Sequence, residues 1–265
     1  MKLETIEIED SGSVRTVWFN RPERRNAITQ KMMAELTETF HSIAQNENIR
    51  VLVLRGRGGN FCAGGDLGHM RDLPKESSSD PTARAYRRMG EALEALNELP
   101  QAVIAAVEGA CVGGGLGMAC ASDFVLCMAN AKLGMPEARA GFIPSQILPT
   151  VVRRIGEGEA RRLAVIAKVI SGYEAHRIGI AHELTETSSD FEASLNNTLS
   201  NLAWAEPTAV AEIKRIIRLT GQAPMSEVLD DAASALSRLL RSDEAAEGIA
   251  AFQEKRPPRW ATSKR

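Results

Sequence analysis

The amino-acid sequence predicts an α/β fold with a largely parallel sheet, followed by a helical C-terminal part. Three short apolar runs, at 51–54, 102–107 and 124–126, have the continuous apolar character of strands that are covered on both faces. Helical patterns stand between these runs, and such an alternation is typical of a parallel sheet. From about residue 145 onward, helical patterns dominate. The 265 residues are enough to bury a sizeable core.

The N-terminal elements follow in order from the local patterns. Two β-like segments, at 3–8 and 14–19, open the chain and are separated by a polar turn. A helix is expected after Thr29, whose hydroxyl is a suitable N-cap, because apolar residues then recur at helical spacing. A second helix is expected at about 82–96, and the glycine cluster at 113–117 is expected to begin a third.

The C-terminal part contains four helical patterns, which are separated near glycine and proline residues and lie at 146–168, 188–203, 207–219 and 224–254. We therefore predict an α/β core at residues 1–195 and a helical region at 196–265. The helical region is too small and too one-sided to fold alone, so we expect it to pack on the core or on a partner subunit.

Composition and charge exclude several classes of function. With 32 Lys and Arg against 34 Asp and Glu, the chain has no general attraction for nucleic acid or for an anionic membrane. The N-terminus has neither an apolar signal core nor a transit pattern, which predicts a soluble cytoplasmic protein. No cysteine or histidine has a partner at metal-ligand spacing, so we expect no metal site and interpret the cysteines as buried free thiols. They are Cys62, Cys111, Cys120 and Cys127.

Two glycine clusters, at 61–67 and 109–117, each follow a buried strand. Glycine lets backbone N–H groups approach a ligand closely, and a helix N-terminus adds unpaired donors. Two such clusters could each aim one N–H group at a single oxygen and form an oxyanion hole. Tight turns or close packing are equally common uses of glycine. A dinucleotide or P-loop site is excluded, because position 118 is methionine and no lysine follows the second cluster.

One acidic residue, Glu137, stands in a mostly apolar segment at 133–144 that glycine and proline residues bound. A carboxylate in apolar surroundings is a candidate acid or base catalyst. A lone glutamate near Arg139 is more often a solvated surface group, and the pattern alone does not decide between the two.

Five motifs together resemble the crotonase superfamily, the enoyl-CoA hydratases and isomerases, in their order and approximate spacing over nearly the whole chain. They are RPERRNAI at 21–28, FCAGGDL at 61–67, GGG at 113–115, PE at 136–137 with GFIP at 141–144, and FQEKR at 252–256. The resemblance implies a crotonase-like spiral of ββα units with a C-terminal helical trimerisation region. It also implies a homotrimer or a dimer of trimers. The region 1–195 would then hold the acyl-CoA site, and 196–265 would be the oligomerisation region.

The resemblance also implies an acyl-CoA substrate, with coenzyme A as part of the substrate and no separate cofactor. Position by position, Gly65 and Gly114 become the oxyanion-hole residues and Glu137 the catalytic acid and base. The implied substrate-binding residues are Ala63, Asp66, Leu67 and Gly113, together with Arg24, Arg25 and Lys255 for the phosphates and the nucleotide end. The last three could equally be ordinary surface charges.

The typical hydratases of the family use two glutamates, and the position of the second is Gly117 here. Three readings follow: a hydratase (lyase) that works with Glu137 alone, a Δ3,Δ2-enoyl-CoA isomerase that uses one carboxylate, or a non-catalytic CoA-binding scaffold. The segment 136–156 resembles the hydratases of branched glutaconyl-CoA esters, such as the isohexenylglutaconyl-CoA hydratases of acyclic terpene degradation. These expectations place the chain in the metabolism of fatty acids or terpenes.

Overall fold

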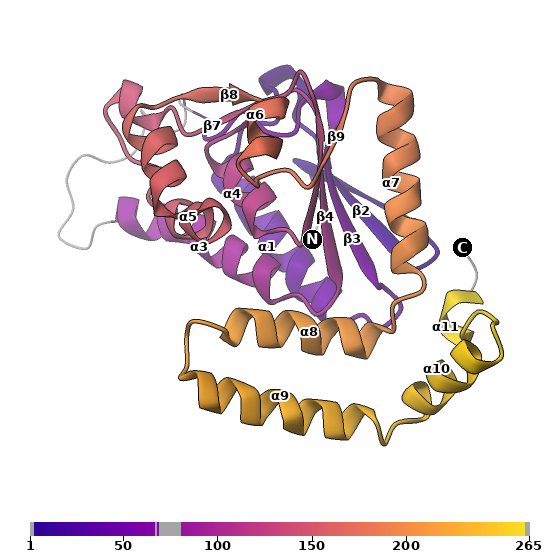
Figure 1. The fold of residues 1–265 in the computed structure, drawn as a ribbon. Helices are drawn as coiled ribbons and strands as arrows, with labels where there is room; N and C mark the ends of the chain where they lie inside the picture. The colour runs from indigo at the N-terminus through magenta and orange to yellow at the C-terminus, as the bar shows by residue number, and fades with distance from the viewer. Residues whose placement is uncertain (1–2, 67, 69–80, 263–265) are drawn as a thin grey trace.

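The protein is described by a computed structural model that covers residues 3–66, 68 and 81–262. Its main sheet has six strands in the order β1-β2-β3-β4-β6-β9 (Figure 1). β1 and β2 form an antiparallel hairpin, and every later neighbour in this sheet is parallel, as the sequence predicts. The strands are β1 (Ile6–Ser11), β2 (Val14–Phe19), β3 (Val51–Gly56), β4 (Ala102–Val107), β6 (Phe124–Met128) and β9 (Glu183–Thr185).

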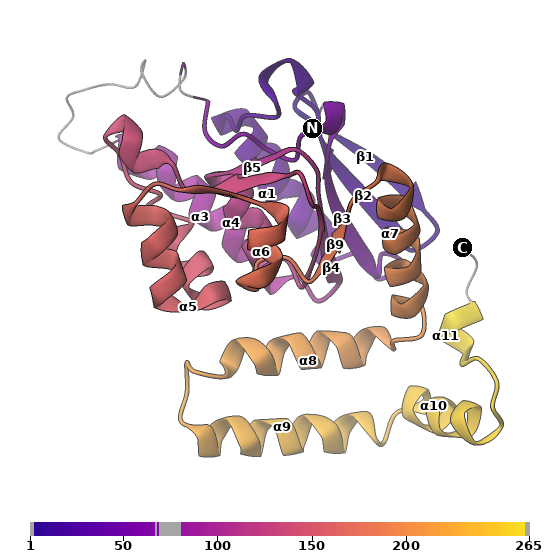
Figure 2. The same ribbon diagram turned by 45° about the horizontal axis from the view of Figure 1, so that its top comes forward.

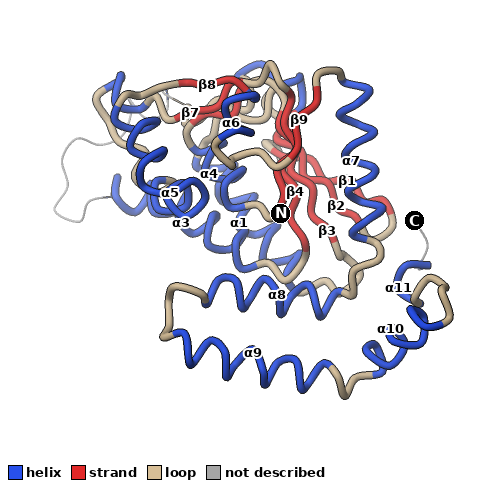
Figure 3. The backbone as a smooth tube through the Cα atoms, in the orientation of Figure 1, coloured by secondary structure: helices blue, strands red, loops and turns tan. Residues whose placement is uncertain are grey.

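A smaller sheet of three strands lies beside the main one and leads into the glycine-rich turns (Figure 3). β5 (Ala110–Val112) pairs in parallel with β7 (Lys132–Gly134), and β7 pairs antiparallel with β8 (Val169–Ser171). Because β5 follows directly after β4, the chain passes from the large sheet to the small one within three residues.

Helices cover both faces of the main sheet. Figure 1 shows α1, α3 and α4 on one side and α7 on the other. Thr29 caps α1 as predicted, because its hydroxyl oxygen accepts a hydrogen bond from the Met32 N–H group at 3.2 Å. The helices of this part are α1 (Gln30–Ala44), α3 (Pro81–Glu98), α4 (Gly114–Ala121), α5 (Leu148–Val165), α6 (Gly172–Arg177) and α7 (Ser188–Leu202), with short 3-10 helices η1 (Pro22–Arg24), η2 (Arg57–Gly59) and η3 (Glu137–Ala140).

The core lies between the sheet and these helices. All six residues of β4 are buried, which confirms that its continuous apolar run predicts a strand covered on both faces. Phe19 and Phe61 meet edge to face in this core, with ring centroids 5.1 Å apart. Phe61 is fully buried, so the segment that carries the first glycine cluster is anchored in the core at its start.

The C-terminal helices are α8 (Pro207–Leu219), α9 (Met225–Leu239), α10 (Asp243–Gln253) and α11 (Arg259–Thr262). In Figure 2, α8 and α9 run side by side below the core, and α10 and α11 extend to one side. The prediction of one helix at 224–254 is wrong. The chain turns at residues 240–242, where the Ser242 hydroxyl accepts a hydrogen bond from the Ala245 N–H group at 3.1 Å and begins α10.

The predicted boundary at residue 195 lies inside α7. Phe191 and Leu195 of this helix are buried in the core, and the chain leaves the core only after α7. Large apolar side chains on the C-terminal helices are more than half exposed, so these helices carry apolar surface that the chain does not cover. They are Ile213, Ile217, Met225, Leu229, Leu236, Leu240, Ile249 and Phe252. The predicted oligomerisation role of residues 196–265 stays a prediction.

Lys214 attaches α8 to the end of the main sheet. Its ammonium group is buried and donates hydrogen bonds to the Gln101 carbonyl oxygen and to Asp123 Oδ2, both at 2.6 Å. Burial lowers the pKa of Lys214, and the neighbouring Asp123 carboxylate opposes that change. In the described part of the chain, no helix is both long and apolar enough to cross a membrane.

We expect Lys214→Ala to lower the free energy of unfolding by about 2 kcal/mol, because the Gln101 carbonyl loses its lysine donor and the Asp123 carboxylate loses its cation, keeping the Val103 N–H group. The loss stays moderate because 39% of the Asp123 side chain is exposed. Urea unfolding followed by circular dichroism measures it. Lys168→Ala is the control: the Lys168 side chain is 44% exposed and makes a long 3.4 Å ion pair with Glu174, so its loss should cost less than about 1 kcal/mol. Equal losses in both variants would contradict the anchoring role.

Candidate active site

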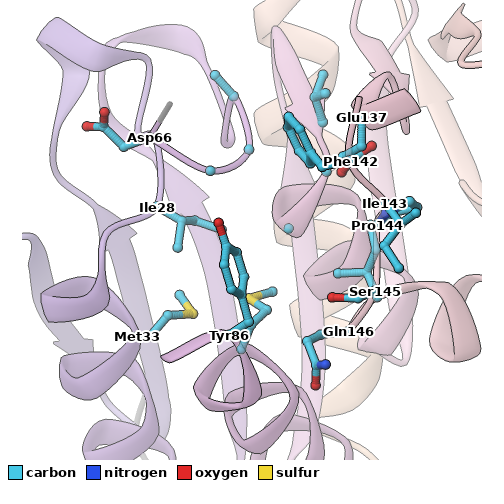
Figure 4. A pocket seen from close by; sticks show the side chains of 18 of the residues that line it. Ile28, Met33, Asp66, Tyr86, Glu137, Phe142, Ile143, Pro144, Ser145 and Gln146 are labelled. Carbon is cyan, nitrogen blue, oxygen red and sulfur yellow. The ribbon is translucent and has the colours of Figure 1, made fainter. Parts of the chain in front are cut away.

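A cavity of about 380 Å³ opens between α1 and α3 on one side and the segment from η3 to α5 on the other (Figure 4). Its lining is predominantly apolar, with a small number of polar groups, as is usual for a small-molecule site. The lining comes from five stretches that lie far apart in the sequence, at 28–33, 63–66, 85–89, 112–114 and 136–147. Both predicted glycine clusters and the predicted acid therefore contribute to one cavity.

The first glycine turn is held by hydrogen bonds along both of its edges. On one edge, Ile28 donates its N–H group to the Gly64 carbonyl at 2.8 Å and accepts the Asp66 N–H group at 3.0 Å. On the other edge, Cys62 donates to the Ala110 carbonyl at 2.7 Å and accepts the Val112 N–H group at 2.9 Å. This double pairing places the first turn directly beside the start of the second.

The pairing also decides where the oxyanion-hole candidates point. Since Ile28 bonds with Gly64 and Asp66, the N–H group of the intervening Gly65 faces the opposite edge, on the side of β5. Gly114 is the first residue of α4, and the first N–H groups of a helix have no partner within that helix. Both glycines line the cavity, so each can present an N–H group to a ligand there.

Gly113 stands between the first turn and the acid. Its φ of +54° lies in the region that favours glycine. A Cβ atom at this position would be 2.7 Å from Glu137 Oε1 and 3.4 Å from the Gly64 Cα atom. Only a residue without a side chain lets the two turns and the carboxyl group come this close.

Glu137 begins η3 directly after Pro136 and lies half-buried in the wall of the cavity (Figure 4). Its Oε2 atom is buried and has no hydrogen-bond partner among the residues that the structure describes. Burial raises the pKa of Glu137, and an interaction with its own backbone N–H group opposes this only in part. A carboxyl group with a raised pKa that faces a cavity can take up and return a proton.

The position of the missing second glutamate is closed by packing. A Cβ atom on Gly117 would lie 2.4 Å from Ile147 Cγ2 and 2.8 Å from Ile147 Cβ, and Ile147 is 3% exposed. An acidic side chain could therefore enter only if Ile147 moved. Besides Glu137, the titratable residues in this lining are Asp66, which pairs with Arg21 at 3.0 Å, and Tyr86, whose pKa is raised by burial.

The other predicted binding residues divide into three groups. Ala63, Asp66 and Gly113 line the cavity, whereas Leu67 lies outside the described residues. Arg24 and Arg25 are exposed at η1, close in sequence to the wall but not part of the lining. Lys255 is exposed after α10, and Figures 1 and 2 place α10 far from α3, so one chain alone does not bring Lys255 to the cavity.

Residues on α1 and α3 were missed as site residues. Met33, Tyr86 and Met89 line the cavity, and Figure 4 shows Met33 and Tyr86 on the wall that faces Ser145 and Gln146. The sequence indicates only that residues 85, 86 and 89 share one face of a helix, and not that this face lines a cavity. In the described stretches, no group of three acidic, histidine or cysteine side chains is arranged to hold a metal ion.

Comparisons with known proteins cover the whole chain. A family model described as enoyl-CoA hydratase/isomerase matches residues 9–263. An enoyl-CoA hydratase/isomerase from Marinobacter aquaeolei has a similar structure, with a TM-score of 0.94 and 41% identity over 98% of this chain and 100% of that one. Pseudomonas aeruginosa AtuE has a TM-score of 0.95 and 38% identity over the same shares. The peroxisomal Delta(3,5)-Delta(2,4)-dienoyl-CoA isomerase of Arabidopsis thaliana is 29% identical over 271 residues, 98% of this chain and 96% of the relative. This likeness confirms the predicted crotonase-like α/β fold with C-terminal helices.

We expect Glu137→Gln to stabilise the fold at neutral pH. Because the pKa of Glu137 is raised in the folded state, the folded protein holds a proton that the unfolded chain has already lost, so the stability contributed by this proton falls as pH rises above about 4.5. The neutral amide of glutamine carries no charge at any pH in this range, so burying it has no pH-dependent cost. Urea unfolding midpoints between about pH 4.5 and pH 8 should show the gain of the variant growing with pH. The exposed Glu157→Gln should show no such trend, and an unchanged pH dependence in Glu137→Gln would contradict the burial argument.

Proposed function

The chain belongs to the enoyl-CoA hydratase/isomerase family, and we propose that it is a hydratase that adds water across the C2=C3 bond of an enoyl-CoA thioester. One observation carries this proposal. The half-buried carboxyl group of Glu137 lies against Gly113 of the second glycine turn, and Gly65 and Gly114 of the two turns line the same cavity. A candidate acid, two candidate oxyanion donors and a predominantly apolar lining thus share one cavity, which supports the proposal.

In the proposed reaction the thioester oxygen lies at the N–H groups of Gly65 and Gly114. Glu137 takes a proton from water, and the oxygen of that water attacks C3. The electron pair of the C2=C3 bond moves onto the thioester as an enolate, whose negative oxygen the two N–H groups stabilise. Glu137 then returns the proton to C2, so one water molecule has been added and the carboxylate is regenerated.

The surroundings of Glu137 suit this double role. Burial raises its pKa toward the operating pH, which makes the carboxylate a stronger base in the first step. Its buried Oε2 atom has no hydrogen-bond partner among the described residues, so no donor there stabilises the charged form and lowers the pKa again. The apolar lining supplied by Ile28, Phe142 and Ile147 keeps bulk water from competing for the enolate.

For the acyl group we propose a branched glutaconyl ester such as isohexenylglutaconyl-CoA. The resemblance of residues 136–156 to such hydratases supports this choice. The cavity adds a second argument, because its apolar wall from α1 and α3 lies opposite neutral hydrogen-bond donors at Ser145 and Gln146, with Tyr86 on α3 (Figure 4). A hydrocarbon branch fits the first surface, and the distal carboxylate can be bound by the neutral donors.

An isomerase is the second candidate, and the packing of Ile147 over Gly117 favours it. Without a second acid on α4, one carboxylate could carry a proton from C4 to C2 through the same enolate. The similar Arabidopsis protein is named as a dienoyl-CoA isomerase, which supports isomerisation as the second candidate reaction.

We expect Glu137→Gln to lower kcat for hydration by about 100- to 10,000-fold, because the amide cannot accept a proton from water. Binding of the CoA ester should remain within about twofold of the wild type, since the amide is nearly isosteric with the carboxyl group and leaves the rest of the cavity lining unchanged. The loss of enoyl-thioester absorbance gives the rate, and calorimetry gives the binding constant. Glu157→Gln, at an exposed side chain on α5, is the control and should keep full activity. An unchanged rate in Glu137→Gln would remove this residue from the mechanism.

A panel of substrates separates the candidates. We expect the highest kcat/KM with isohexenylglutaconyl-CoA, lower values with straight 2-enoyl-CoA esters, and no turnover of 3-enoyl-CoA esters. Mass spectrometry of the products identifies the reaction, because hydration adds one water molecule and isomerisation leaves the mass unchanged. Conversion of 3-enoyl-CoA without added mass would establish the isomerase instead. Binding of all esters without turnover would establish a CoA-binding scaffold.

A further inference from the structure

The side chain of Cys62 lies behind the two glycine turns, on the side away from the cavity. Its sulfur accepts a hydrogen bond from the Gly64 N–H group at 3.4 Å, and the residue is 0% exposed. Cys62 does not line the cavity, whereas Gly64 and its neighbour Gly65 do. The thiol therefore contacts the first turn one residue before the proposed oxyanion donor.

The same sulfur also contacts the second turn. The backbone N–H group of Gly115 interacts with it as a hydrogen-bond donor. A Cβ atom on Gly115 would lie 2.7 Å from Cys62 Cβ, 2.8 Å from the Cys62 carbonyl oxygen and 3.2 Å from the sulfur. Gly115 follows Gly114 directly, so the thiol touches each turn at the residue next to an oxyanion donor.

We propose that Cys62 is a positioning residue for the oxyanion hole, and that its sulfur sets the separation and direction of the Gly65 and Gly114 N–H groups. This inference rests on the proposed function, because it assumes that these two groups bind the thioester oxygen. Cys62 touches neither substrate nor reacting atoms, and it acts only through the backbone of the two turns.

The chemistry of a buried thiol suits this position. Burial raises the pKa of Cys62 to about 12, although the Gly64 and Gly115 N–H groups act in the opposite direction. The thiol therefore stays neutral at physiological pH. A neutral acceptor holds the two turns without placing a negative charge behind the site where the enolate oxygen becomes negative. A carboxylate in this place would hold the amides equally well but would repel the enolate.

A second buried cysteine provides a matched control. Cys127 in β6 is also 0% exposed, and its sulfur lies 3.4 Å from the Met128 carbonyl oxygen, so it contacts neither glycine turn. Cys127→Ala removes the same atom from the same core. A difference between Cys62→Ala and Cys127→Ala is therefore due to the contacts of the Cys62 sulfur with the glycine turns. It is not due to the general loss of a buried thiol, because both variants lose one.

The experiment compares wild type, Cys62→Ala, Cys62→Ser and Cys127→Ala. A cinnamoyl-CoA thioester serves as the probe, because polarisation of its carbonyl by the oxyanion hole shifts its absorption band to longer wavelength. We expect Cys62→Ala to lose most of this shift and about tenfold in kcat with KM within about twofold, less than the about 100-fold loss of an entire donor. Cys62→Ser keeps a hydrogen-bond acceptor at this position, so it should recover part of the band shift and part of the lost kcat. Cys127→Ala should match the wild type.

The outcomes separate this inference from the proposed function. If the wild type neither hydrates enoyl-CoA nor shifts the probe band, the proposed function fails. If the wild type does both, and Cys62→Ala shifts the band and turns over as Cys127→Ala does, only the positioning role is overturned. Thermal unfolding is measured for each variant. A loss of stability in Cys62→Ala with an unchanged band shift also overturns the positioning role, because the sulfur would then contribute packing alone.

Discussion

The site depends on one structural constraint: the first glycine turn is hydrogen-bonded along both edges. Ile28 holds one edge through Gly64 and Asp66, and β5 holds the other through Cys62. Because both edges are paired, the backbone of this turn cannot rotate about its own axis. The N–H group of Gly65 therefore points to the side of the second turn. The constraint comes from backbone pairing, which is why the residues that provide it, at 28 and 110–112, carry no chemistry of their own.

The surroundings of the half-buried Glu137 stabilise its charged form poorly. The raised pKa that results is what suits this carboxyl group to taking up and returning a proton. Glu137 has an Oε2 atom without a partner among the described residues, and its surroundings disfavour the charged form. Such a group costs stability at neutral pH, as groups retained for function often do. Gly113 makes this arrangement feasible, because a side chain there would collide with the carboxyl group. The position of the Glu137 carboxyl group therefore requires glycine at residue 113 of the second turn.

Among the described residues that line the cavity, the carboxylic acids are Glu137 and Asp66, and Asp66 pairs with Arg21, whereas typical hydratases of this family use two glutamates. Ile147 fills the space above Gly117, so the departure from the family pattern is part of the packing and not a simple deletion. The side chains next to the Gly117 Cβ position are those of Ile147 and Leu93, which are apolar, and Ile147 also lines the cavity. Under the proposed function, the same position lacks a second proton carrier and has an apolar side chain beside it, which suits a hydrocarbon acyl group.

The sequence by itself determined those features that depend on near neighbours in the chain. Apolar runs predicted the buried strands, Thr29 predicted the start of α1, and glycine clusters after strands marked both turns, since each signal is local. Only the tertiary structure decided the turn at residues 240–242, the contribution of Tyr86 and Met89 to the cavity, and the contact of Ile147 with Gly117. These depend on contacts between residues far apart in the chain. Local propensity carries no information about which distant surface a side chain will meet.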